Sequence, residues 1–435
     1  GREGPVPLSY AQRRMWLMDR LGQDRAAYHV PFATRLRGPL DPEALGRAVT
    51  ALTVRHQVLR TRYAERDGEP YQEVLTPAPA VRVRVVAEPA PATGTLRAAA
   101  ARPFDLAEGP LPRVLAVRHG PEDHTVLLTF HHISVDGASL DVLCRELAEL
   151  YAAECAGRAA RLPEPVAQYA DYARREQRRA GELEAGLEHW LTRLAGARPV
   201  PLPPPEQPRA SAQPTAPLTG AGLLHRPLAD GTLGALRAVS ARHRTTPFTV
   251  VLAAAYAALL RTTGHEDLVV GCAADHRDGT RTRELVGLCV NTLPLRVHTE
   301  GAADFGELLD LVRDTLLEGI AHRDVPFDLI VERLGGAGRD RRGGTLLNVT
   351  ADLVPAPPVL RLPGTAGGEP VPVDLGAAKF GLSLCVEETA HGARCLVQYD
   401  RAGLDGGAAL RLLDAFADAL NTAASGEPAA PLRRP

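Results

Sequence analysis

The segment HTVLLTFHHISVDGAS, residues 124–139, decides how its part of the chain folds. Its first seven residues are a short apolar run with the length and composition of a buried strand. A polar stretch follows, and Ser139 is placed to cap the helix predicted by the next segment, SLDVLCRELAELYAAE. Four leucines of that segment share one helical face: Leu140, Leu143, Leu147 and Leu150. The predicted order is strand, polar loop and helix, and the loop holds two histidines and an aspartate.

Helix and strand patterns also alternate along the rest of the chain. In LSYAQRRMWLMDRL, residues 8–21, Ser9 and Gln12 have the spacing of a capping box, and Asp41 with Pro42 begins a second predicted helix. FATRLRG, YQEVL and VRVRVV have the composition of strands. In the second half, a helix pattern at 246–263 is followed by the strand-like EDLVVGCAADHRD and ELVGLCVNTLPLRV, and FGLSLCVEE and ARCLVQYD suit two strands joined by the turn TAHG. The sequence therefore predicts a mixed α/β (α+β) fold.

The length predicts more than one domain. A chain of 435 residues is too long for one compact core, so we expect two. The proline-rich stretch ARPVPLPPPEQPRASAQPTAP, residues 197–217, is the expected linker. It separates a predicted N-terminal lobe, residues 1–196, which carries the two histidines, from a predicted C-terminal lobe, residues 218–435.

The composition argues against several classes of protein. Hydrophobic residues make up 45% of the chain, charged residues 23%, and the net charge is −2, which indicates a folded protein with no overall attraction to nucleic acid or an anionic membrane. No apolar run reaches transmembrane length, and the start of the chain lacks a signal-peptide pattern. The six scattered cysteines, with no CxxC pair, are typical of reduced core residues. We therefore expect a cytoplasmic protein.

The polar loop carries the pattern HHxxxDG, made by His131, His132, Asp136 and Gly137. Adjacent side chains on a strand point to opposite faces, so one histidine can face a cavity while the other packs. A histidine that is neutral near pH 7 can accept a proton from an amine or an alcohol, and the glycine lets a substrate approach the backbone closely. The alternative is that both histidines are structural.

The surroundings of the pattern narrow its chemistry. No serine or cysteine motif of the nucleophile-elbow type is present, which argues against a covalent acyl-enzyme. Adjacent histidines diverge and no third ligand stands at zinc spacing, so we expect no metal site. Direct acyl transfer with a positioned histidine is the reaction that remains.

HHISVDG resembles the HHxxxDG signature of the condensation domains of nonribosomal peptide synthetases, which belong to the chloramphenicol acetyltransferase-like acyltransferases. Further segments resemble the family's motifs, in the family's order: LSYAQRRMW at 8–16, RHQVLRTRY at 55–63, YADYARREQ at 169–177, VGLCVNTLPLR at 286–296 and HRDVPFD at 322–328. Departures from these motifs include Gln57 where Glu is usual, Arg175 where Trp is usual and Gly381 where FDLSL has Asp. The resemblance covers nearly the whole chain.

The resemblance implies two chloramphenicol acetyltransferase-like lobes in a V-shaped pseudo-dimer with a central tunnel. It also implies amide-bond formation, in which a carrier-bound aminoacyl amine attacks an upstream carrier-bound acyl or peptidyl thioester. The expected partners are an upstream donor and a downstream acceptor peptidyl carrier protein and a neighbouring adenylation domain. The domain is expected to be a monomer and to bind no cofactor itself, because phosphopantetheine arms arrive on the carriers.

The resemblance also implies roles for individual residues. His132 is the active-site histidine, either as a general base or as a group that positions the amine. Gly137 offers its backbone N–H to the developing oxyanion. Asp136 is structural and pairs with an arginine from the second half of the chain, with Arg277 as the first choice and Arg296 as the second.

The remaining implied roles concern packing and the tunnel. His131 packs or forms hydrogen bonds beneath the loop, and Asn291 and Thr292 lie near the tunnel. Ala138 stands where the family often has Trp, and Cys289 where it often has Phe; both changes either widen the acceptor side or reflect local repacking.

Other functions on the same fold stay open. They are epimerisation, ester formation, acyl transfer without a carrier, and a non-catalytic recruitment domain. Sequence around the motifs, such as VQYDRAGLD, favours a condensation subtype that accepts a D-configured donor residue.

Overall fold

The computed structural model describes residues 6–20, 25–109, 111–204, 220–277, 279–334, 346–389, 392–426 and 432. They form two compact units. Unit 1 consists of Gly1–Glu182, Asp275–Val290 and Pro357–Leu375, and unit 2 consists of Leu183–Ala274, Asn291–Ala356 and Gly376–Pro435. Both units combine helices with a β-sheet, which confirms the predicted α/β class.

The two units do not follow a single cut in the sequence. Helix α6 (Glu184–Arg193) precedes the predicted linker, yet Leu187 and Trp190 pack into the core of unit 2. The segments Asp275–Val290 and Pro357–Leu375 follow the linker but belong to unit 1. The predicted lobes, 1–196 and 218–435, differ from the units at these places, and residues 205–217 of the linker lie outside the described residues.

Unit 1 contains a sheet with the strand order β12-β2-β7-β6-β5 and a smaller sheet with the order β1-β4-β3. Its strands are β1 (Val6–Pro7), β2 (His29–Arg37), β3 (Thr61–Arg66), β4 (Glu69–Val74), β5 (Val83–Ala87), β6 (Arg113–Gly120), β7 (Asp123–His131) and β12 (Ala366–Val371). Its helices are α1 (Tyr10–Arg20), α2 (Pro42–Arg55), α3 (Thr93–Ala101), α4 (Gly137–Ala156) and α5 (Tyr169–Arg178), with the 3-10 helices η1 (Arg25–Tyr28), η2 (Gln57–Arg60) and η3 (Ala180–Glu182).

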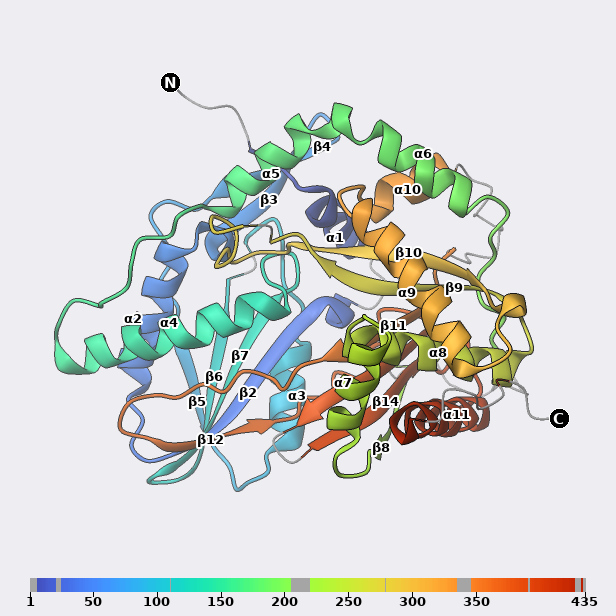
Figure 1. The fold of residues 1–435 in the computed structure, drawn as a ribbon. Helices are drawn as coiled ribbons and strands as arrows, with labels where there is room; N and C mark the ends of the chain where they lie inside the picture. Colours follow the sequence, from blue (N-terminus) through green and yellow to red (C-terminus); the bar gives the residue numbers. More distant parts are fainter. Residues whose placement is uncertain are drawn as a thin grey trace, which may run out of the picture. The chain divides into compact units, whose positions relative to one another are not determined.

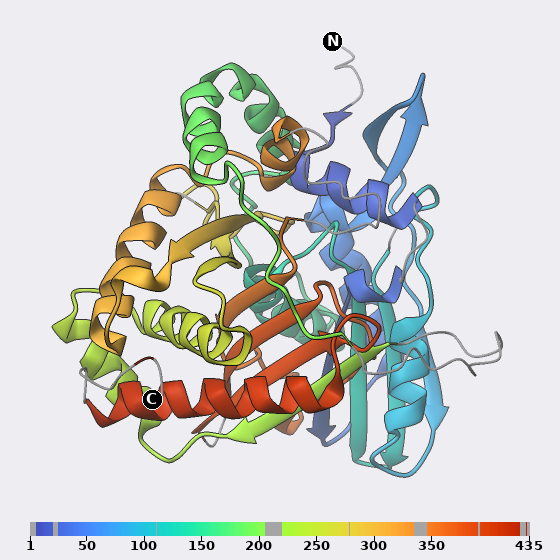
Figure 2. The same cartoon turned by 90° about the vertical axis from the view of Figure 1, so that its right-hand side faces the viewer.

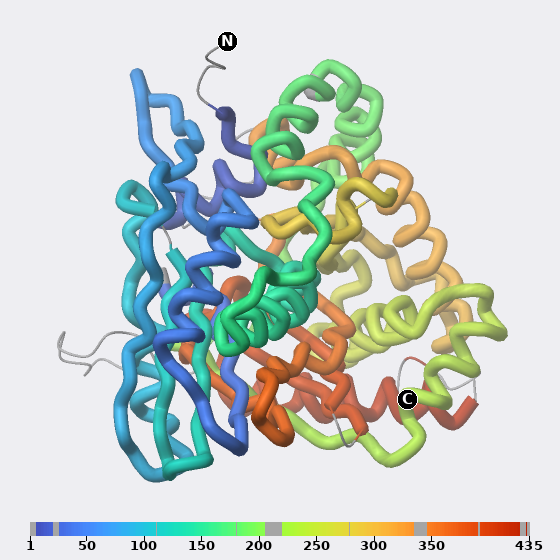
Figure 3. The backbone as a smooth tube through the Cα atoms, turned by 90° about the vertical axis from the view of Figure 1, so that its left-hand side faces the viewer, coloured from blue at the N-terminus to red at the C-terminus, as the bar shows by residue number. Residues whose placement is uncertain are grey.

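Strand β7 is covered on both faces, which explains why it carries apolar side chains on both. Val126, Leu128 and Phe130 pack in a cluster with residues of α2 and α4, while Leu127 packs on the other face with residues of α3. Helices α2 and α4 lie side by side over the sheet (Figures 1 and 3). The strand predicted at 124–130 is therefore confirmed, and its end delivers the two histidines.

The predicted helix starts in unit 1 are mostly confirmed. Ser9 Oγ accepts from Gln12 N at 3.1 Å and Gln12 Oε1 accepts from Ser9 N at 3.1 Å, which is the predicted capping box. Asp41 caps α2 with Pro42 as its first residue. The prediction that Ser139 caps α4 is wrong, because the helix begins at Gly137 and Asp136 is its N-cap.

Unit 2 contains a sheet with the strand order β10-β9-β11-β13-β14-β8. Its strands are β8 (Ala221–Pro227), β9 (Asp267–Asp275), β10 (Val290–His298), β11 (Val349–Val354), β13 (Leu382–Thr389) and β14 (Gly392–Asp400). Its helices are α6, α7 (Thr232–Arg242), α8 (Pro247–Thr263), α9 (Phe305–Ala321), α10 (Phe327–Arg333) and α11 (Gly406–Ser425), with the 3-10 helix η4 (Thr299–Gly301). Strands β13 and β14 pair as predicted, although part of the TAHG turn lies outside the described residues.

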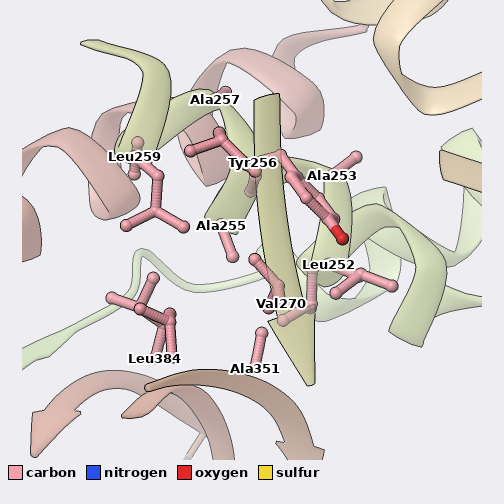
Figure 4. Packing of buried hydrophobic residues seen from close by; sticks show 14 of the residues in the cluster. Leu252, Ala253, Ala255, Tyr256, Ala257, Leu259, Val270, Ala351 and Leu384 are labelled. Carbon is pink, nitrogen blue, oxygen red and sulfur yellow. The ribbon is translucent and has the colours of Figure 1, made fainter. Parts of the chain in front are cut away.

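Helix α8 is the centre of the core of unit 2. Every residue from Thr249 to Leu260 is buried, so the helix has no polar face. Figure 4 shows Tyr256 and its neighbours close to Val270, Ala351 and Leu384 of the sheet. Helix α11 lies along β14 and β8 (Figure 2).

Two further features bear on function. In the part of the chain that the structure describes, no helix is long and apolar enough to cross a membrane. All six cysteines are free, and only Cys155 is exposed.

Candidate active site

His131 is the last residue of β7 and lies beneath the loop. It pairs with His29 of β2, and its side chain is 1% exposed. Ile133 N donates to His131 Nδ1 at 3.1 Å, and the ring stands edge-on to Phe104 with centroids 5.8 Å apart. The structure thus places His131 among packed and hydrogen-bonded groups, where the sequence analysis expects it.

His132 follows directly and is half-buried. Its N–H donates to Tyr28 O at 2.8 Å, and its Nδ1 lies 2.7 Å from Val135 O. Because a carbonyl oxygen only accepts, Nδ1 must carry a proton in this contact. In a neutral imidazole the lone pair is then on Nε2, which is the form that a general base requires.

The turn between the histidines and α4 is held from within and from α1. Ser134 N and Ser134 Oγ donate to His131 O at 3.0 and 2.9 Å. Gln12 Nε2, from α1, donates to Ile133 O at 3.4 Å. Gln12 of the LSYAQRRMW segment therefore contacts the backbone of the histidine loop directly.

Asp136 is the N-cap of α4, and five hydrogen bonds reach its buried carboxylate. Oδ1 accepts from Ser139 N at 3.0 Å, Ser139 Oγ at 2.7 Å and Arg277 Nη2 at 2.7 Å. Oδ2 accepts from Arg277 Nη1 and from Cys289 N, both at 2.9 Å. Only 1% of the Asp136 side chain and 5% of the Arg277 side chain are exposed, so the charges neutralise each other away from water.

Arg277 comes from the second half of the chain, 141 residues from Asp136, but its segment Asp275–Val290 belongs to unit 1. Its guanidinium also donates to Leu285 O, Gly287 O, Ser139 Oγ and Asp275 Oδ1. The pairing of Asp136 with Arg277, the first choice from the sequence, is therefore present, and it lies within one unit.

The contacts of two residues in this network were not predicted from the sequence. Ser139, fully buried, accepts from Gly287 N at 3.1 Å and contacts Asp136 and Arg277 with the same oxygen. Cys289 contributes its backbone N–H, while burial raises the pKa of its thiol and keeps it neutral beside the carboxylate. The Asp-x-x-Ser spacing at the start of α4 is a sequence signal for the contact between Ser139 and Asp136. The contact of Cys289 has no such signal, because its donor is a backbone N–H.

Gly137 and Ala138 form the exposed first residues of α4. A Cβ built on Gly137 meets no atom within 4 Å in the described part of the chain, so space for a ligand is present at its backbone. The first N–H groups of a helix lack acceptors within the helix and favour negative charge. This end of α4 therefore suits an oxyanion close to the His132 loop.

The residues predicted near the tunnel lie in β10 of unit 2. Asn291 Nδ2 donates to Arg323 O at 2.9 Å and Val325 O at 2.7 Å, and its Oδ1 accepts from Phe327 N at 3.0 Å. Its amide thus holds the link between α9 and α10, and Thr292 beside it is half-buried. The contribution of Ala138, Asn291 and Thr292 to a tunnel stays a prediction.

Arg296, the second choice as partner of Asp136, has other contacts. It binds Asp267 at 2.8 and 2.7 Å and donates to Ala195 O at 2.7 Å, all within unit 2. These contacts tie the end of α6 to β9 and β10. Arg296 is therefore a structural residue of unit 2.

Comparison with known proteins identifies the family of this chain. A family model described as "Condensation domain" matches residues 2–434. The chain belongs to the condensation-domain family. The resemblance predicted from the HHxxxDG loop and the accompanying motifs is therefore confirmed.

Relatives of this condensation domain are regions of large synthetases. It is 34% identical over 443 residues to one of the linear gramicidin synthase proteins of Brevibacillus parabrevis, covering 98% of the chain and 8% of that protein. It is 39% identical over 339 residues to the phosphinothricin tripeptide synthetase PhsC of Streptomyces viridochromogenes, covering 76% of the chain and 31% of that protein. The chain thus spans a small part of the curated relatives that it matches.

Solved structures with the same fold include two domains of natural-product assembly. The X-domain from teicoplanin biosynthesis aligns with a TM-score of 0.86 and 26% identity, covering 99% of this chain and 97% of that chain. The first condensation domain of the CDA synthetase aligns with a TM-score of 0.77 and 22% identity, covering 98% of each chain. At 22% identity, the similarity to the CDA synthetase domain shows the fold alone.

Proposed function

We propose that this condensation domain forms an amide bond between two carrier-bound substrates. The acceptor amine nitrogen attacks the carbonyl carbon of the donor thioester; the C–N bond forms and the C–S bond breaks. The proton of the amine passes to Nε2 of His132 and leaves with the thiol of the donor's phosphopantetheine arm. The donor arrives on an upstream carrier protein and the acceptor on a downstream one, next to an adenylation domain.

The observation that carries this proposal is the contact between His132 Nδ1 and Val135 O. It places a proton on Nδ1, so the neutral imidazole carries its lone pair on Nε2 and can accept the proton there, next to a helix start that can stabilise the oxyanion. Gly137 supplies the N–H at that start. Asp136 acts as a positioning residue, because its carboxylate is engaged by Ser139, Arg277 and Cys289 rather than by a substrate group.

The test uses donor and acceptor carrier proteins loaded chemically with their thioesters, with products measured by intact mass. We expect His132→Ala to lose nearly all product while its melting temperature stays at the wild-type value. His298→Ala is the matched control, because His298 is an exposed histidine of unit 2. An unimpaired product yield in His132→Ala would refute the catalytic role.

Three arms of the same assay separate the alternatives. An amine acceptor and a hydroxyl acceptor distinguish amide from ester formation, and free acceptors test whether a carrier is needed. Donors that end in a D- or an L-residue test the predicted D-specific subtype. Epimerisation without transfer would be seen as a change in donor configuration without a mass change.

A recruitment role is the second candidate, supported by one structural relative. A complex of the teicoplanin X-domain with OxyB has been solved, and it aligns with this chain at a TM-score of 0.85 and 26% identity. The intact His132, Asp136 and Gly137 favour catalysis. Binding of a tailoring enzyme, unchanged by His132→Ala, in a domain that forms no product would support recruitment instead.

A further inference from the structure

The segment that carries Arg277 also passes close to Asp136, where three consecutive residues, 287–289, make contacts through their backbone. Gly287 O accepts from Arg277 Nη2 at 3.2 Å, and Gly287 N donates to Ser139 Oγ at 3.1 Å. Leu288 O accepts from the hydroxyl of Tyr169 at 2.6 Å, and Cys289 N donates to Asp136 at 2.9 Å. The position of this backbone therefore sets where the arginine and the carboxylate meet.

Tyr169 holds the segment from behind. It is 1% exposed, and its ring occupies the place that a side chain at residue 287 would need: a Cβ there would lie 1.9 Å from Tyr169 Cδ2. Gly287 also has φ +155, a conformation that favours glycine. Because the Tyr169 hydroxyl donates to Leu288 O, the contact at 2.8 Å with Ser9 Oγ has the serine as donor.

Tyr172, one helical turn further along α5, holds the other end of the same segment. Its ring lies 5.3 Å from that of Tyr169, and its hydroxyl is 3.2 Å from His276 Nδ1. His276 precedes Arg277, and its N–H donates to Cys289 O at 2.9 Å. The two tyrosines of YADYA thus contact both ends of the segment that runs from 276 to 289.

We propose that Tyr169, assisted by Tyr172, is a positioning residue for the reaction. It fixes residues 287–289, which hold Arg277 and Asp136 at the start of α4, and so sets the geometry of the His132 loop. The role rests on the proposed function for its effect on rate, but its effect on the segment can be measured without any reaction. It assigns the YADYA segment a task beyond filling the core.

The test compares Tyr169→Phe with Tyr256→Phe. Tyr256 is a matched control because it is also fully buried and its hydroxyl donates to a backbone carbonyl, Leu295 O, at 2.7 Å, within unit 2. Both variants keep the ring and lose a hydrogen bond to a backbone carbonyl; Tyr169→Phe also removes the acceptor of the Ser9 hydroxyl. We therefore expect both variants to melt below the wild type, Tyr169→Phe by the larger amount.

The first readout is alkylation of two buried cysteines, followed by peptide mass spectrometry. Cys289 lies in the held segment and Cys272 lies in unit 2; each is 1% exposed. Loss of the hydrogen bond to Leu288 O should raise the labelling rate of Cys289 about tenfold in Tyr169→Phe and leave that of Cys272 unchanged. Tyr256→Phe should not change the labelling of Cys289.

The second readout is the condensation rate with loaded carriers. We expect kcat to fall about tenfold in Tyr169→Phe with KM unchanged, and to stay at the wild-type value in Tyr256→Phe. A domain with no activity in the wild type refutes the proposed function, while the labelling still tests the role of Tyr169. Equal labelling of Cys289 in both variants, or an unchanged kcat in an active Tyr169→Phe domain, would overturn the positioning role.

Discussion

Arg277→Met should destabilise the protein strongly, because it leaves the Asp136 carboxylate buried without its counter-charge. Removing one partner of a buried ion pair costs about 3–5 kcal/mol. Asp136 keeps its contacts with Ser139 N, Ser139 Oγ and Cys289 N, so we expect the lower end of that range, about 3 kcal/mol. Met fills much of the volume of the arginine stem, which limits the packing loss.

Thermal unfolding followed by calorimetry measures this loss. In a unit of this size, each kcal/mol lowers the melting temperature by about 2–4 °C, so Arg277→Met should melt about 6–12 °C below the wild type. Arg62→Met is the matched control, because Arg62 and Glu73 form a pair at 2.8 Å in the same unit with 41% and 46% of their side chains exposed. We expect the control to melt within about 2 °C of the wild type.

A second substitution separates charge from packing. Adding Asp136→Asn to Arg277→Met removes the stranded charge and keeps the shape of the side chain, so part of the lost melting temperature should return. If Arg277→Met melts as high as Arg62→Met, or if Asp136→Asn only adds to the loss, the reasoning about the buried charge is refuted.

Three further predictions concern the histidine loop and His29, which pairs with His131 in the sheet. Gly137→Ala should fold with an unchanged melting temperature and lose condensation activity, because its new methyl group enters open space that a substrate needs; full activity would count against an oxyanion at this position. Asp136→Ala should lose activity with a displaced 132–137 backbone in its crystal structure; an inactive variant with an undisturbed loop would contradict the structural role. Burial lowers the pKa of His29 below 6.5, so the unfolded chain binds the proton first and stability falls as pH drops below about 6.5. His29→Asn, which keeps the donor to Ala100 O, should weaken that dependence in melting curves recorded between neutral and mildly acidic pH, and an unchanged curve would exclude His29.

The histidine loop could be predicted because its signals are local. The apolar run of β7, the divergence of neighbouring side chains and the polar residues before α4 all lie within about twenty residues. The prediction of Ser139 as the N-cap of α4 was wrong because Asp136 and Ser139 both suit that position. In the structure they share the task, with Asp136 as N-cap and Ser139 three residues inside.

The partner of Asp136 could be named only through the family resemblance. Arg277 follows β9 and Arg296 lies within β10, and no spacing rule brings either to residue 136. Contacts of this separation depend on the path of the backbone, and the atoms that fix that path here are the amide and carbonyl groups of residues 287–289. Backbone groups are the same in every residue, so the sequence carries no direct sign of them.

The segment Asp275–Val290 also has a consequence for engineering. It connects β9 to β10 and lies after the proline-rich stretch in the sequence. It nevertheless supplies the Arg277 guanidinium and the Cys289 N–H that bind Asp136, the N-cap of α4. A chimera spliced at that stretch would join the aspartate of one parent to the arginine of another. When condensation domains are recombined, residues 275–290 should therefore be taken from the same parent as the first half of the chain.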